Sequence, residues 1–84
     1  MYIESVIIKT SEGLHSHSLD IFLKKAKEYK STMWLQKNNR TITIQNYLDI
    51  LALNVNKGEK IEIIADGEDE QLAVAALSKL VKEN

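Results

Sequence analysis

Residues 57–81 read KGEKIEIIADGEDEQLAVAALSKLV, and the spacing of the apolar residues changes partway along this stretch. Up to residue 66 polar and apolar side chains alternate, which is typical of a strand with one buried face. Gly67 and three acidic residues follow, and carboxylates suit the positive end of a helix dipole. We therefore predict a strand over residues 60–66 and then a helix whose core-facing stripe comprises Leu72, Ala73, Ala76, Leu77, Leu80 and Val81.

The chain before this stretch predicts three more strands and two more helices. An apolar, β-branched run over residues 2–8 indicates a first strand, and turn-forming residues end it at Thr10, Ser11, Glu12 and Gly13. A first helix is expected over residues 16–28, because apolar side chains recur there at helical spacing at Leu19, Phe22, Leu23, Ala26 and Tyr29.

A hairpin and a short helix are expected in the middle of the chain. Residues 32–37 and 41–44 alternate as strands do, and Asn38 and Asn39 between them tolerate the left-handed backbone of a tight turn. A short apolar helix follows over residues 47–53 and ends at Asn54.

The element order is thus β-α-β-β-α-β-α, which favours an α+β fold in two layers. Three helices are expected on one face of a four-stranded, largely antiparallel sheet, with the other face toward solvent or a partner. With 84 residues, 44% of them hydrophobic, nearly the whole chain must join one core, so residues 1–84 are interpreted as a single domain.

Composition excludes several classes of function. The net charge of −1 is unlike that of a protein that binds nucleic acid or an anionic membrane, and Arg40 is the only arginine. Without cysteine there is no disulfide and no thiolate zinc site. The first nine residues do not resemble a secretory signal, and no apolar run is long enough for a membrane span, so we expect a cytoplasmic protein.

Reactive side chains concentrate in residues 13–18, GLHSHS, at the junction between the first loop and the first helix. Unsatisfied N–H groups at a helix N-terminus can hold an anion such as phosphate. The helix dipole also disfavours protonation of a histidine there, so its ring stays nucleophilic and suits a phosphohistidine. Alternatively, Ser16 or Ser18 is an ordinary N-cap and both histidines are merely solvated. His15 and His17 do not share a helical face, and we expect no metal or other cofactor.

Two surface features have competing interpretations. Asp20, Lys24 and Lys27 continue from the junction at helical spacing, either as a solvated face or as charges that steer an acidic partner. The apolar residues at 47–53 either all pack into the core or leave a docking patch beside Leu14.

The whole chain resembles HPr, the histidine-containing phosphocarrier family of the bacterial sugar phosphotransferase system. The resemblance rests on residues 12–15, EGLH, on the LAL step at 51–53, and on residues 57–70. It implies an open-faced β-sandwich with sheet order 1-4-2-3. It also implies that His15 accepts a phosphoryl group on Nδ1 from enzyme I and passes it to sugar-specific acceptor proteins, as a carrier rather than a turnover enzyme. Partners would dock on Leu14, Tyr47, Leu48 and Leu51, rimmed by Lys24 and Lys27.

The chain departs from the family pattern around its histidine. Where the family continues Ala-Arg-Pro, this chain has Ser16, His17 and Ser18, so a histidine takes the place of the phosphate-neutralising arginine and a serine that of the helix-starting proline. Asn46 takes the position of a serine that a regulatory kinase phosphorylates in many Gram-positive members, and it has no hydroxyl to modify. Asn54 replaces a usual glycine and also accepts left-handed geometry.

The resulting hypothesis is a phosphocarrier in which His15 is the nucleophile and Ser16, His17 and Ser18 stabilise the phosphoryl group. The alternative is an HPr-like protein that carries no phosphate and binds a transcriptional regulator or another partner through Leu48 and Leu51. An independent anion-binding module is a third reading.

Overall fold

The computed structural model describes residues 1–11 and 13–82, with the side chain of Ser16 left out. Glu12, which the sequence predicts in the turn after the first strand, lies outside the described residues. The elements are β1 (Tyr2–Ile7), α1 (Ser16–Ala26), β2 (Thr32–Lys37), β3 (Arg40–Thr43), α2 (Tyr47–Leu53), β4 (Lys60–Asp66) and α3 (Glu70–Lys82).

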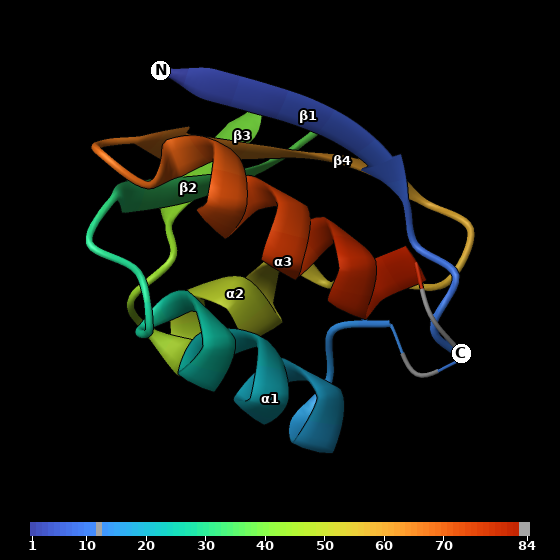
Figure 1. Cartoon of the computed structure of the whole chain (residues 1–84). Helices are drawn as coiled ribbons and strands as arrows, with labels where there is room; N and C mark the ends of the chain where they lie inside the picture. The colour runs from blue at the N-terminus through green and yellow to red at the C-terminus, as the bar shows by residue number, and fades with distance from the viewer. Residues whose placement is uncertain (12, 83–84) are drawn as a thin grey trace.

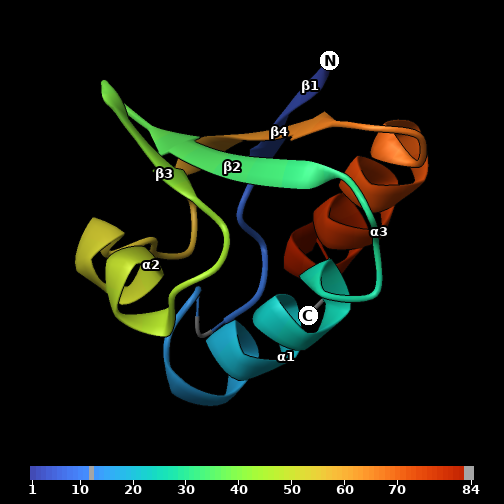
Figure 2. The same cartoon turned by 90° about the vertical axis from the view of Figure 1, so that its left-hand side faces the viewer.

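The strands form one antiparallel sheet in the order β1-β4-β2-β3. In Figure 1 the sheet lies above all three helices, and Figure 2, turned by 90°, shows them again on that one face. The predicted α+β architecture, its element order and its sheet order 1-4-2-3 are therefore confirmed. Among the residues that the structure describes, no helix is long and apolar enough to cross a membrane.

The core lies between the sheet and the helices because alternate strand residues face inward. Strand residues at the centre of this layer include Val6, Leu35, Ile61 and Ile63, each at most 3% exposed. The helices contribute a matching set of buried side chains: Leu19, Phe22, Leu23, Ile50, Leu53, Ala73, Val74, Leu77 and Val81.

The stripe predicted for the last helix is wrong at one position. Leu72 is 69% exposed, whereas Val74, which was not predicted, is fully buried. At 3.6 residues per turn, Leu72 falls on the opposite side of α3 from the stripe that runs through Ala73, Leu77 and Val81.

The first helix ends at Ala26, two residues earlier than predicted, with Lys27 as its C-cap. The carboxylate of Asp69 accepts hydrogen bonds from the backbone N–H groups of Lys30 (2.8 Å) and Ser31 (3.0 Å), and the Ser31 hydroxyl donates to it as well. These bonds tie the loop before β2 to the start of α3.

Left-handed backbone occurs where the sequence predicts it. Asn38 in the β2–β3 hairpin has φ 57°, and Asn54 at the end of α2 has φ 55°. Asparagine adopts this conformation more readily than most residues, so neither position requires glycine.

Candidate functional site

The loop that carries His15 rests on the chain between α2 and β4. Leu14 N–H donates to the carbonyl oxygen of Val55 (2.9 Å), and the Leu14 side chain is buried. Gly13 has φ 65°, and a Cβ there would clash with the Val55 carbonyl and lie 2.9 Å from Asn56 Cα. Glycine therefore permits both the left-handed turn and the close approach that brings residues 13–15 against residues 55–56.

His15 itself is the N-cap of α1, with extended backbone (φ −135°, ψ 150°). The proposal that Ser16 or Ser18 is the N-cap is therefore wrong. The Ser18 hydroxyl instead donates toward the carbonyl oxygens of Gly13 (2.6 Å) and His15 (2.8 Å) and accepts from His15 N–H (3.2 Å). Ser18 thus fixes the loop and the first turn, and its hydroxyl is committed to these backbone groups rather than directed to a bound phosphate.

The imidazole of His15 is partly exposed and contacts a residue 41 positions later. Its Nε2 lies 2.9 Å from Oδ1 of Asn56. His15 directly precedes the first turn of α1, where Ser18 N–H donates to His15 O (3.1 Å) and the N–H groups of Ser16 and His17 come too early in the helix for an intrahelical acceptor. An imidazole and the backbone donors of a helix N-terminus therefore occur in consecutive residues, which suits the transfer of an anionic group.

Asn56 belongs to a polar network around the end of α2. Its side-chain N–H donates to Asn54 O (3.0 Å), and its backbone N–H donates to Glu59 Oε1 (2.8 Å). Lys37 Nζ reaches the same two acceptors, at 2.6 Å from Asn54 O and 2.9 Å from Glu59 Oε1, and also lies 3.1 Å from Leu53 O.

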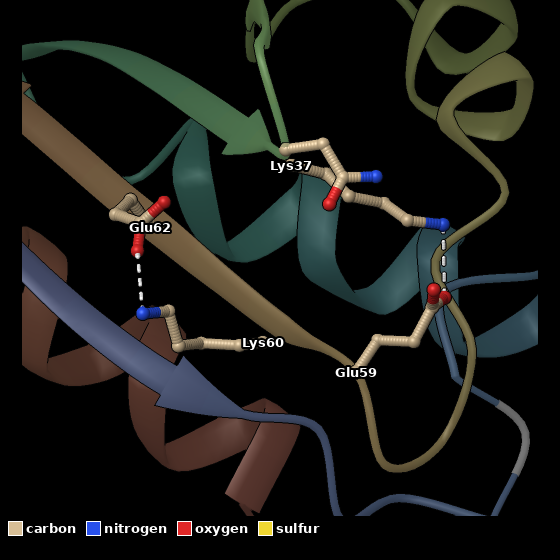
Figure 3. Close-up of a pocket in the computed structure, with 5 residues that line it drawn as sticks. Lys37, Glu59, Lys60 and Glu62 are labelled. Atoms are coloured by element: carbon tan, nitrogen blue, oxygen red, sulfur yellow. Dashed lines mark hydrogen bonds and ion pairs between the residues drawn. The ribbon is translucent and has the colours of Figure 1, made fainter.

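Figure 3 shows the ion pair between Lys37 and Glu59, with Lys60 and Glu62 on the neighbouring strand. The Lys37 side chain is only 12% exposed. Hydrogen bonds from Lys37 and from the Asn56 backbone hold the pKa of Glu59 below its usual value, so this carboxylate stays ionised at neutral pH.

The remaining residues of the predicted phosphate site are placed as follows. His17 lies in the first turn of α1 and is exposed, and Ser16 begins the helix with its side chain outside the described set. Arg40 lies at the β2–β3 hairpin, where it is opposite Lys37 in the register of the two strands. Within residues 1–11 and 13–82, no group of three His, Cys, Asp or Glu side chains could hold a metal ion.

The apolar residues of α2 divide between the core and the surface. Ile50 and Leu53 are buried and Leu51 is partly buried, whereas Leu48 is 69% and Tyr47 37% exposed. Leu14 is only 2% exposed and offers almost no surface to a partner. An exposed patch therefore exists, but it consists of Tyr47 and Leu48 rather than of the whole predicted set.

The predicted basic rim and the residue before α2 are placed as follows. Lys24 on α1 and Lys27 at its C-cap are exposed, and Lys24 forms an ion pair with Asp20 (3.3 Å). Asn46 is the N-cap of α2 and accepts from Leu48 N–H at 2.8 Å. Its amide oxygen thus does the capping that a serine hydroxyl could do at this position.

These features define an open-faced β-sandwich of the HPr type with a histidine capping its first helix. Residues 3–83 match the family model for the PTS HPr component phosphorylation site. The chain is 33% identical over 79 residues to the phosphocarrier protein HPr of Borreliella burgdorferi, covering 94% of this chain and 92% of the relative. The chain belongs to the HPr family.

Other relatives agree with this assignment. The HPr-like protein Crh of Bacillus subtilis is 28% identical over 80 residues, covering 95% of this chain and 94% of that protein. The crystal structure of HPr-C-His from Thermoanaerobacter tengcongensis superimposes with a TM-score of 0.93 at 29% identity, covering 98% of this chain and 92% of that one.

Sequence reasoning missed the network behind the histidine. Lys37 carried a usable signal, because strand alternation puts it on the same face as Met33 and Leu35, and a lysine on a core face needs partners. Asn56 carried no such signal, since its role depends on a tertiary contact across 41 positions.

Proposed function

We propose that this chain is a phosphocarrier of the phosphoenolpyruvate-dependent sugar phosphotransferase system, which accepts a phosphoryl group from enzyme I on His15 Nδ1 and passes it to sugar-specific acceptors. The observation that carries the proposal is the position of His15, partly exposed as the N-cap of α1 and directly before the N–H groups of Ser16 and His17 at the helix N-terminus. Membership of the HPr family supports it, and the residues that match the family model, 3–83, include the predicted acceptor His15.

The proposed transfer is an in-line displacement. The lone pair on Nδ1 forms a bond to phosphorus while the bond from phosphorus to the donor atom of enzyme I breaks, and that electron pair stays on the donor atom. The acceptor ring keeps its single N–H proton on Nε2 and becomes a cation that partly offsets the charge of the phosphoryl oxygens. The second transfer reverses these steps toward the next acceptor. The protein mainly positions the groups and supplies donors to the oxygens.

The phosphoryl oxygens would be stabilised by the backbone N–H groups of Ser16 and His17 and, when protonated, by the ring of His17. Histidine carries a full charge only in its protonated form, so it is a weaker substitute for the family's arginine near neutral pH. Ser18 contributes through its backbone and by holding the loop, because its hydroxyl already bonds Gly13 and His15.

Partner proteins would contact the exposed face around α2, where Tyr47 and Leu48 provide apolar area and Leu51 adds a partly buried edge. Lys24 on α1 and Lys27 at its C-cap would meet acidic side chains of the partner. Since Asn46 cannot be phosphorylated on a hydroxyl, regulation by a kinase at this position is not expected. Both transfers would take place in the cytoplasm.

The test is phosphorylation of the purified chain by enzyme I of the same organism and phosphoenolpyruvate. We expect acid-labile, base-stable phosphate that is absent from His15→Ala and present in a matched control, His17→Ala, at a lower initial rate. Loss of labelling only in His15→Ala supports the carrier role. Failure of the unmodified chain to accept phosphate from its own enzyme I would contradict it and favour a binding role without phosphate.

A further inference from the structure

The side-chain amide of Asn56 has one orientation that satisfies its neighbours. Its Nδ2 donates to Asn54 O at 3.0 Å, which leaves Oδ1 facing His15 Nε2 at 2.9 Å. The flipped amide would place Oδ1 against another oxygen, the carbonyl of Asn54, and lose that bond. The local hydrogen bonds therefore decide which atom of Asn56 meets the histidine.

The framework that holds Asn56 is itself held from the sheet. Lys37 Nζ has three acceptors within 3.1 Å, namely Leu53 O, Asn54 O and Glu59 Oε1, which match its three N–H bonds. Two of these acceptors, Asn54 O and Glu59 Oε1, also take hydrogen bonds from Asn56. The end of β2 thereby fixes both the position and the orientation of the Asn56 amide.

This orientation has a consequence for the ring of His15. Oδ1 of an amide accepts hydrogen bonds and cannot donate one, so Nε2 must carry the proton. A neutral imidazole has only one N–H, which leaves the lone pair on Nδ1. We propose that Asn56, held by Lys37 and Glu59, is the positioning residue that keeps His15 in the tautomer with a free Nδ1 and orients its ring.

The inference rests on the proposed function, because it explains how the nucleophilic atom is made available for transfer. It also predicts a stronger contact during the reaction. When Nδ1 bonds to phosphorus, the ring becomes cationic and its Nε2–H becomes a better donor to Asn56. An interaction that strengthens as the reaction proceeds lowers the barrier rather than only tightening binding.

The first readout is the tautomer of the unphosphorylated ring, from long-range ¹H–¹⁵N correlations at a pH well above the ordinary histidine range. We expect the His15 proton on Nε2. In Asn56→Ala the His15 pattern should approach that of a solvated ring, for which exposed His17 is an internal reference. Asn56→Asp retains an acceptor and should keep the proton on Nε2. Asn39→Ala, on the exposed hairpin turn, is the matched control and should change nothing.

The second readout is the initial rate of phosphate acceptance from enzyme I. We expect Asn56→Ala to be slower by roughly tenfold, because it loses a hydrogen bond to a group that becomes charged. Asn56→Asp should recover much of the rate, and chemical denaturation of each variant shows whether it is folded. An unmodified chain with the proton on Nδ1, or an Asn56→Ala variant with unchanged tautomer and rate, would overturn the inference. If the unmodified chain accepts no phosphate, the proposed function fails, while the tautomer comparison still decides what Asn56 does.

Discussion

The close approach at Gly13 leads to a prediction about the substitution Gly13→Ala. The residue has φ 65°, and an added Cβ would overlap the Val55 carbonyl oxygen and crowd Asn56 Cα at 2.9 Å. Both neighbouring atoms are backbone, so no side chain can rotate away to make room. The loop has to shift, and with it the N-cap His15.

The expected cost has two parts. Left-handed backbone at a residue with a Cβ costs about 1–2 kcal/mol. The overlap with backbone adds a similar amount or more, comparable to the roughly 1–3 kcal/mol of overpacking. We therefore expect Gly13→Ala to lower the free energy of unfolding by about 2–4 kcal/mol, which for a domain of this size lowers Tm by roughly 10–20 °C.

Gly58→Ala provides the matched control. Gly58 also has positive φ, 91°, but nothing lies within 4 Å of its added Cβ. It therefore carries the backbone penalty without the contact. Urea denaturation and thermal melts of both variants isolate the contact as the difference between them. If Gly13→Ala is no more destabilising than Gly58→Ala, the packing of residues 13–15 on residues 55–56 does not support the site as described.

Two further predictions concern the surface of α2 and the loop before β2. Leu48→Ala should change the free energy of unfolding by no more than about 0.5 kcal/mol, because the side chain is 69% exposed. The same variant should nevertheless slow phosphate transfer from enzyme I. Leu53→Ala, at a buried position on the same helix, should lower the free energy of unfolding measured by urea denaturation by about 2–5 kcal/mol. An equal loss of stability in both, or an unchanged transfer rate in Leu48→Ala, would argue against an exposed docking patch. Hydrogen bonds from the Ser31 hydroxyl and the Lys30 N–H lower the pKa of Asp69 from its ordinary 3.8. Its contribution to stability is therefore complete above that value and lost as the pH falls through the lowered pKa. In Asp69→Asn the stability measured by denaturation from pH 6 down to pH 2 should depend less on pH, and a profile as steep as that of the unmodified chain would contradict the role of this carboxylate.

The fold was predictable from the sequence because its information is local. Alternation in residues 60–66 and the change of period after Gly67 depend only on neighbouring residues, and so do the left-handed turns at Asn38 and Asn54. The errors occur where position around a helix or a tertiary contact decides. Leu72 is apolar and yet exposed, because the start of α3 sets which of its residues face the sheet.

The site was predictable only in part for the same reason. Local sequence singled out His15, but not the residue that contacts its ring. Asn56 is an ordinary polar loop residue until folding brings residues 13–15 onto the chain after α2. Lys37 could have been noticed as a cation on a core-facing strand position, although its acceptors on Leu53, Asn54 and Glu59 could not.

The two missing family residues have different structural consequences. Proline presets the first helical turn by locking φ, and Ser18 fixes the same turn by hydrogen bonds to Gly13 and His15, so the loss of proline is compensated within the loop.

Arginine supplies a permanent positive charge, and exposed His17 does not. In the proposed transfer the charge of the phosphoryl group is then offset mainly by backbone N–H groups and by the cationic ring of His15 itself. Because Nε2–H of that ring donates a hydrogen bond to Asn56 Oδ1, the replacement of the family's arginine by His17 makes the transfer depend more strongly on the contact between His15 and Asn56. We accordingly expect the variant His17→Arg to reduce the effect of Asn56→Ala on the transfer rate, whereas purely additive effects of the two substitutions would show that the two groups act independently.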